Sequence, residues 1–297
     1  MNKVNYIMPM FLVAIGASLF SLNDLVFKHL TSIDIIWWEF LVFGVPVEMI
    51  IIIFFAGYIY NFNRRKIYNE LLPKKFFYPL LRGLMAILSI ALMFLSLKNL
   101  PLSITTILLQ TAPLWMAFVA FFTQKERPDI PIILAIIFGM SGVLFIVNPS
   151  FEGINIYLIF PLLVGLLNAL MNFIITKKSN DASPLSFAFW LFVSNGLIGL
   201  IIWTIVGVNF PNLNQMIWII VAGSLGATAF IFVSYGYSLA SGKFARVGVM
   251  SYIQLPVAII LGSIFYNEKL TLNSYIGSII IIFAGIFVIL KDNLKAK

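Results

Sequence analysis

The stretch "LKNLPLSITTILLQTAPLWMAFVAFFTQKE" (residues 97–126) decides the fold, because its plan returns in the second half of the chain. There, "YSLASGKFARVGVMSYIQLPVAIILGSIFYNEK" (residues 237–269) has the same order of a short loop, an apolar helix with a central proline and a glutamate at the exit. Pro113 and Pro256 are 143 positions apart. This correspondence indicates a duplication.

The composition places the chain in a lipid bilayer. Of the 297 residues, 61% are hydrophobic and only 10% are charged, and the mean hydropathy is +1.03, which is too apolar for a surface exposed to water. The net charge of +8 could suggest nucleic acid, but the basic residues fall in short gaps between apolar runs. With no cysteine and a single histidine, the chain offers no disulfide and no multi-histidine metal site.

Ten apolar segments are long enough to be membrane-spanning helices, which need about 20 residues to cross roughly 30 Å of hydrocarbon. Their continuous hydrophobicity excludes a barrel of alternating strands. They run approximately over residues 8–27, 35–59, 77–97, 103–123, 130–147, 154–176, 184–207, 215–237, 247–266 and 272–290. The expected fold is therefore an all-α membrane protein, with five spans in each of two repeats, residues 1–148 and 149–297.

The basic residues predict the orientation of these spans. Sixteen lysines and arginines fall at one set of helix ends and three at the other, and basic loops stay in the cytoplasm. Because ten spans place both termini on one side, we expect both in the cytoplasm and the protein in the inner membrane of a bacterium. Each repeat holds an odd number of spans, so the repeats are expected to be inverted, which is typical of alternating-access carriers.

The two prolines are expected to kink their helices. Pro113 and Pro256 should each remove one backbone hydrogen bond near the middle of a span. The carbonyls freed in this way could line a cavity. For either proline alone, ordinary tolerance of proline in a membrane helix is the alternative.

Three segments carry a resemblance to a known family. The order "NDLVFKHL" (residues 23–30), then "LLRGLMAILSIALMFLSLKNL" (residues 80–100) running into the stretch quoted first, then "GMSGVLFIV" (residues 139–147) resembles the drug/metabolite transporter superfamily, and within it the EamA-type members. The Asn-Asp-x-x-x-Lys element of the first span and the Arg-Gly of the third are most similar to a branch that includes S-adenosylmethionine uptake transporters.

The resemblance implies a central cavity between the two repeats, lined by the first, third, fourth, sixth, eighth and ninth spans. The branch carries arginine early in the second span, after two aromatic residues, whereas this chain has Glu39 in "IIWWEF" (residues 35–40). The positions that match the family's cavity are Asn23, Asp24, Lys28 and Arg82, with the residues around Pro113 and Pro256.

Charged side chains inside the spans are candidates for function, because each costs about 2.5–3.5 kcal/mol in hydrocarbon and usually faces a partner or a cavity. Asp24 and Glu39 share a depth of about 5–6 Å inside the external boundary. Lys28 follows Asp24 by one helical turn, so we predict that it reaches Asp24 and can reach Glu39. Two interpretations stay open: a structural charge cluster that joins the first two spans, and an external gate in which Lys28 exchanges partners.

Glu48 is predicted near mid-membrane, on the face of the second span opposite Glu39. A protonated structural residue, a pair with Arg82 and a role in proton coupling are all compatible with that position. Arg82 lies about 8 Å from the cytoplasmic boundary, so its long side chain could instead reach the surface.

Uncharged polar and aromatic side chains in the middle of the spans that the resemblance places around the cavity are candidates for substrate contacts. Aromatic faces attract cationic groups by about 0.5–2 kcal/mol. For each of these residues, ordinary helix packing is the alternative. The set is Gln110, Trp115, Asn168, Asn172, Tyr235, Tyr252 and Gln254.

The sequence predicts a secondary transporter that moves a small polar metabolite by alternating access. The acids in or beside the spans are Asp24, Glu39 and Glu48. The bases are Lys28 and Arg82, and this excess of acid favours a substrate with a cationic group, such as an amino acid, an amine or an S-adenosylmethionine-like compound.

Two other classes of membrane protein, a flippase and an enzyme, are alternatives to a metabolite transporter. A flippase for a lipid or lipid-linked substrate is the alternative, and a membrane-embedded enzyme is disfavoured because the chain offers no nucleophile paired with a base. We expect no cofactor and no metal, and coupling to protons or other ions stays open. The expected partners are a small-molecule substrate and membrane lipid, without nucleic acid, for a monomeric or homodimeric chain.

Overall fold

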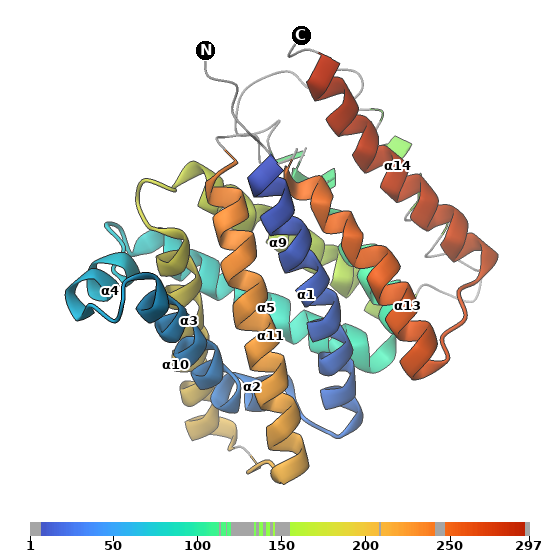
Figure 1. Cartoon of the computed structure of the whole chain (residues 1–297). Coiled ribbons are helices and arrows are strands. Elements are labelled where there is room, and N and C mark those ends of the chain that lie inside the picture. The colour runs from blue at the N-terminus through green and yellow to red at the C-terminus, as the bar shows by residue number, and fades with distance from the viewer. Residues whose placement is uncertain are drawn as a thin grey trace.

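The chain forms a bundle of helices in the computed structural model (Figure 1). The structure describes residues 7–112, 114–116, 118–119, 155–207, 209–240 and 247–294, and single residues between 134 and 145. The helices are α1 (Ile7–Ser32), α2 (Trp37–Phe43), α3 (Val45–Ile59), α4 (Arg64–Leu71), α5 (Phe77–Asn99), α6 (Leu102–Leu109), η1 (Ile156–Leu158), α9 (Ile159–Lys177), α10 (Pro184–Val206), α11 (Leu213–Ser238), η2 (Val249–Ile253), α13 (Gln254–Tyr266) and α14 (Leu272–Leu294).

Described helices lie in nine of the ten predicted spans. Five of them are long and apolar enough to cross a membrane, and α2 with α3 makes a sixth that is bent by 42°. The fourth, ninth and tenth predicted spans hold the shorter apolar helices Leu102–Met116, Met250–Tyr266 and Leu272–Ala284. The fifth span, 130–147, and the boundary between the repeats fall mostly outside the described residues. Figure 1 shows the start of α1 and the end of α14 at the same end of the bundle.

The bend between α2 and α3 was not predicted, although its cause is local. Pro46 has no N–H for the carbonyl of Val42, so the helix cannot continue regularly through this point. Gly44 stands at the junction, where a Cβ would lie 2.5 Å from the ring of Phe40. The break places Glu48 in the first turn of a new helix.

The fourth and ninth spans are interrupted just before their prolines rather than at mid-helix. α6 ends at Leu109, and Gln110 begins a turn before helix resumes. In the ninth span the 3₁₀ segment η2 passes into α13 at Gln254, two residues before Pro256. Pro256 therefore stands in the first turn of α13, where a missing N–H costs little. Pro113 lies outside the described residues.

The contacts between helices follow the duplication. α1 packs on α11 as α9 packs on α5, and α5 packs on α10 as α11 packs on α3. α1 meets α13 as α9 meets α6, while α6 with α13 and α2/α3 with α10 are pairs of equivalent spans. Each of these contacts joins one half of the chain to the other, so the centre of the bundle is shared by both halves.

Small residues let α1 and α11 approach closely along their length (Figure 1). A Cβ on Gly16 would lie 3.1 Å from the carbonyl oxygen of Ala229, and a Cβ on Gly236 would lie 3.0 Å from that of Pro9. In lipid, where the hydrophobic effect does not press helices together, such close packing is a main source of helix association.

We predict that Gly236→Ala destabilises the protein, because the added methyl group meets the Pro9 carbonyl and the Val13 side chain. Overpacking of this kind costs about 1–3 kcal/mol. Thermal unfolding in detergent should show a lower midpoint. Gly196→Ala is the control, since its Cβ would meet only a methyl group of Val45, at 3.3 Å; an equal loss in both variants would contradict the close-packing account.

Candidate functional site

A cavity with an empty volume of about 1050 Å³ lies where the two halves meet. Its walls come from α1, α5, α6, α9, α11, η2 and α13, the spans implied by the resemblance, with additions from α2 and α3. The charged residues that line it are Asp24, Glu48 and Arg82.

One face of α1 forms a wall of this cavity. Phe20, Asp24 and Phe27 recur at helical spacing on that face, and Asn23 stands beside them. Asn23 and Asp24 are 4% and 5% exposed. Polar groups so deep in a membrane bundle require partners, and the partner of Asp24 is Gln254, from the opposite half of the chain.

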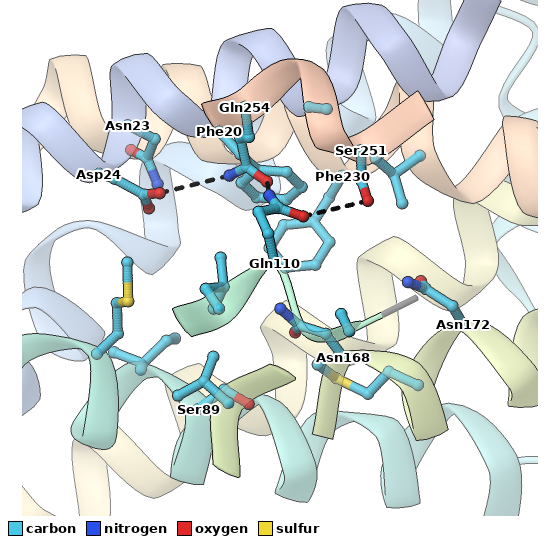
Figure 2. A pocket seen from close by; sticks show the side chains of 18 of the residues that line it. Phe20, Asn23, Asp24, Ser89, Gln110, Asn168, Asn172, Phe230, Ser251 and Gln254 are labelled. Atoms are coloured by element: carbon cyan, nitrogen blue, oxygen red, sulfur yellow. Dashed lines mark hydrogen bonds between the residues drawn. The ribbon is translucent and has the colours of Figure 1, made fainter. Parts of the chain in front are cut away.

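Four side chains form a hydrogen-bonded chain along the cavity (Figure 2). Ser251 Oγ donates to Gln110 Oε1 at 3.3 Å, Gln110 Nε2 donates to Gln254 Oε1, and Gln254 Nε2 donates to Asp24 Oδ2 at 3.4 Å. Gln110 and Gln254 stand at the breaks of the fourth and ninth spans. The chain of hydrogen bonds therefore joins the two halves at the breaks of two equivalent spans.

Further polar residues line the cavity from α5 and α9. Figure 2 shows Ser89 and Asn168 across the hollow from Asp24, with Asn172 farther along α9. Tyr237 of α11 also lines it, and its hydroxyl donates to Met116 Sδ at 3.7 Å. The cavity thus combines a few polar groups with mostly apolar and aromatic walls, which is typical of small-molecule sites.

Several buried polar atoms that belong to cavity residues lack a hydrogen-bond partner within the described residues. They are Asn23 Oδ1, Glu48 Oε2, Arg82 Nε and Ser89 Oγ. Arg82 Nη1 donates to the carbonyl of Phe187 at 3.1 Å, and the guanidinium lies 5.5 Å from the centre of the Phe230 ring. An unsatisfied buried polar group is costly, so its presence in a cavity points to a ligand.

The family model that matches the chain is the EamA-like transporter family, over residues 6–148 and again over 155–291. The chain belongs to the EamA-like transporter family. It is an integral membrane protein of two EamA repeats, and the cavity lies where these repeats meet.

Similar proteins with curated names are transporters. The chain is 25% identical over 247 residues to an uncharacterized transporter of Helicobacter pylori, covering 80% of this chain and 81% of that protein. It is 21% identical over 224 residues to an S-adenosylmethionine uptake transporter of Rickettsia conorii, covering 75% of each. It is 23% identical over 203 residues to a riboflavin transporter of Brucella anthropi, covering 67% of this chain and 71% of that one.

A solved crystal structure has the same fold. It matches with a TM-score of 0.68 and covers 98% of this chain and 99% of its own at 12% sequence identity. The whole EamA architecture, rather than one repeat, is therefore shared with it.

Lys28 does not pair with Asp24, contrary to the sequence prediction. Its ammonium lies 3.2 Å from Glu268 Oε1, donates to the carbonyl of Leu100 at 2.9 Å and lies over the ring of Tyr266. Asp24 accepts from Gln254 instead. The helical spacing made the first pairing feasible, but the fold gives each group a partner from a distant part of the chain.

Glu268, in the loop that follows α13, is the centre of this second site. Its carboxylate accepts from the N–H groups of Leu102 and Ser103, at 2.6 and 2.9 Å, and from the Ser103 hydroxyl at 2.7 Å. It thereby caps the N-terminus of α6, where negative charge is favourable. Burial by itself would raise the pKa of Glu268, but the hydrogen bonds from Ser103 and Leu102 and the charge of Lys28 hold this pKa below its ordinary value of 4.5.

The predicted role of Glu39 in recognition is not supported by its position, because Glu39 does not line the cavity. It stands in the first turn of α2, where Oε2 accepts from the N–H of Ile36 at 3.1 Å. Its Oε1 accepts from the N–H of Asn209 at 3.3 Å, in the segment before α11. Glu39 therefore joins the start of α2 to the segment that precedes α11. It bonds to neither Asp24 nor Lys28 among the described residues.

Glu48 and Arg82 both line the cavity, but neither predicted arrangement of Arg82 is found. No ion pair joins them within the described part of the chain. Arg82 is only 1% exposed and does not reach the surface. The two groups are a carboxyl group and a guanidinium in one cavity, each with an atom that has no partner among the described residues.

Three of the predicted aromatic contacts lie away from the cavity. Trp115 donates from Nε1 to Thr111 Oγ1 at 3.2 Å and packs on the core beside α9 and α11. Tyr235 packs on the core between α3, α10 and α11. Tyr252 is buried in a cluster between α6 and α13. For these three, the alternative of ordinary helix packing is the one observed.

Tyr237 was missed in favour of Tyr235, although the sequence holds a signal for it. Gly226 faces the cavity side of α11, next to Glu48. Eleven residues later, Tyr237 returns to nearly the same face of the helix, whereas Tyr235 is about 180° away from Gly226. Phe230 follows Gly226 by one turn and belongs to the same stripe. The helical face on which Gly226 lies is therefore the signal that would have identified Phe230 and Tyr237 as cavity residues.

We predict that Glu268→Gln destabilises the protein in a pH-dependent way. Because the folded pKa lies below 4.5, ionised Glu268 stabilises the fold fully above about pH 4.5, and this stabilisation is lost as the pH falls through the folded pKa. The difference in melting temperature between wild type and variant should therefore be constant near pH 7 and shrink toward pH 3. Lys269→Gln, an exposed change in the same loop, is the control; a difference that persists to pH 3 would refute the ionic account.

Proposed function

We propose that the protein is a secondary transporter of the cytoplasmic membrane that moves a small polar metabolite by alternating access. In this proposal ten spans form two inverted repeats with both termini in the cytoplasm. Two observations support it. The chain belongs to a transporter family, and the contacts between spans of the first and second halves recur when the two halves are exchanged. Inverted repeats that meet at a central site are the usual architecture for alternating access.

The single observation that carries the proposal is the cavity of buried charges between the repeats. Asp24, Glu48 and Arg82 are each 5% exposed or less and come from three different spans. Charges inside a membrane bundle mark substrate or ion pathways, since a purely structural core would avoid their cost.

The lining favours a polar substrate with a cationic group over a lipid. Two carboxyl groups and one guanidinium line the cavity, while its aromatic walls include Phe20 and Phe230. Among the similar proteins, one is named for S-adenosylmethionine, a cationic compound, and another for riboflavin, a neutral one. We therefore propose an amino acid, an amine or an S-adenosylmethionine-like compound as the substrate.

In this proposal the Glu268 site is the gate that closes the external end of the bundle during alternating access. Lys28 belongs to the first repeat and Glu268 to the second, and the pair closes over the start of α6. Opening that end would separate the pair, and each group could then be hydrated outside the hydrocarbon. This keeps the gate interpretation of Lys28, with Glu268 as its partner.

Uptake into proteoliposomes tests the proposed function. We expect saturable uptake of at least one labelled cationic compound among S-adenosylmethionine, L-arginine, agmatine and phenethylamine, and none of riboflavin. Asp24→Asn should weaken uptake about tenfold or more, since a hydrogen bond to a charged group is worth about 1.5–3 kcal/mol. Glu39→Gln, a buried carboxylate outside the cavity, should transport like wild type. Uptake of riboflavin alone would overturn the cationic substrate class.

Alternating access can be tested with single cysteines, because the chain has none. Ser89→Cys places a thiol at the cavity, and Ser96→Cys places one on the same helix outside it, where Ser96 is 0% exposed. We expect a membrane-impermeant maleimide to label Ser89→Cys in right-side-out and in inside-out vesicles, with protection by the transported compound. Ser96→Cys should stay unlabelled. Labelling of Ser89→Cys from one side only would rule out alternating access.

A further inference from the structure

We propose that the cavity recognises a zwitterion, with Arg82 binding the substrate's carboxylate and Glu48, beside Asn23, binding its ammonium group. The inference rests on the proposed function and narrows its substrate class. It separates amino-acid-like compounds, which carry both charges, from simple amines, which carry one. The residues that carry it are the opposite charges left unpaired in the same cavity.

Arg82 forms no ion pair within the part of the chain that the structure describes. Its guanidinium is 1% exposed, gives one hydrogen bond to the Phe187 carbonyl and lies over the Phe230 ring, while Nε has no partner within the described residues. The ring face and the carbonyl stabilise a cation, but neither carries negative charge. A carboxylate can accept two parallel hydrogen bonds from a guanidinium, which neutralises its charge and fixes its orientation.

One oxygen of Glu48 has no donor among the described residues. Its Oε2 is buried without a partner among the described residues, as is Oδ1 of Asn23, and both residues line the cavity. The first turn of α3 favours negative charge at this position. The two residues adjoin at Gly226, where a Cβ would lie 3.0 Å from Glu48 Oε1 and 3.5 Å from Asn23 Nδ2. An ammonium group offers three N–H donors, enough for both orphaned oxygens.

The two poles of the site, Glu48 of α3 and Arg82 of α5, adjoin residues of α11 that are one helical turn apart. Glu48 adjoins Gly226 of α11, and Arg82 lies over Phe230, four residues later. Four helical residues rise about 6 Å along α11, and both groups line the same cavity. The protein does not neutralise the poles by pairing them, because no ion pair joins Glu48 and Arg82 within the described residues.

Asp24 stands apart from this pair. It already accepts from Gln254 in the chain of side chains that joins the repeats. A zwitterion bound between Glu48 and Arg82 would leave the Asp24 charge free for a further cationic group on the substrate, such as a guanidinium or a sulfonium. Such a substrate would place its carboxylate at Arg82, its ammonium group at Glu48 and its further cationic group at Asp24.

Matched ligand pairs test this inference, because decarboxylation removes one pole and leaves the rest of the molecule. The pairs are S-adenosylmethionine with its decarboxylated analogue, L-arginine with agmatine, and L-phenylalanine with phenethylamine. We expect wild-type protein in detergent to bind the carboxylated member of at least one pair tenfold or more tightly. Arg82→Gln should reduce that preference to about one while amine binding persists, and Arg82→Lys should restore part of it.

Glu48→Gln and Gly226→Ala test the other pole. Glu48→Gln should weaken both members of a pair equally. Gly226→Ala should weaken both without changing any charge, because its methyl group would crowd Glu48. If a variant fails to fold, the wild-type ratios decide by themselves.

The outcomes separate this inference from the proposed function. Amines that bind wild type as tightly as their carboxylated partners would overturn the zwitterion site and leave a transporter of cationic compounds. A preference for the carboxylated members that survives Arg82→Gln would overturn the assignment to Arg82. Binding of no pair, with no uptake of any cationic compound, would overturn both.

Discussion

The structure depends on the cost of leaving a polar or charged group unsatisfied in hydrocarbon. Water is absent there, so each polar side chain must find a partner in the bundle or face a cavity. Glu39 and Lys28 find protein partners: Glu39 at the start of α2 and Lys28 at Glu268. Glu48 and Arg82 keep atoms unpartnered among the described residues, and both line the large hollow between the repeats. The same cost thus separates the structural charges from those that point to a ligand.

Breaks in the helices place the polar groups at the cavity. Gln110 and Gln254 occupy the interruptions of the fourth and ninth spans, and Glu48 follows the interruption of the second. An irregular backbone is tolerated inside a membrane bundle only where protein or a cavity surrounds it. A proline follows closely after the breaks at Gly44 and Gln254. The same local feature, a proline that interrupts the helix, accounts for the break and for polar side chains that point to the cavity.

Close helix contacts and the terminal ion pair have different mechanical consequences. The glycine contacts between α1 and α11 place backbone against backbone, and such an interface resists small displacements. The bonds around Glu268 are made by a flexible side chain at the end of the bundle, and they join α1, the start of α6 and the loop after α13. The proposed alternating access would therefore keep the glycine interface intact and break the Glu268 bonds.

The sequence by itself determined the membrane class, the duplicated plan and most polar residues of the cavity. The membrane class follows from hydropathy and the duplicated plan from matched spacings along the chain. The cavity residues, such as Asn23, Gln110 and Gln254, follow from the resemblance to the EamA-type family. Only the tertiary structure decided which charges pair. Lys28 is one turn from Asp24 but bonds to Glu268, 240 positions away, because the fold brings that carboxylate to the N-terminus of α6. Helical spacing restricts which residues share a face, whereas partners across the bundle depend on how two distant halves meet.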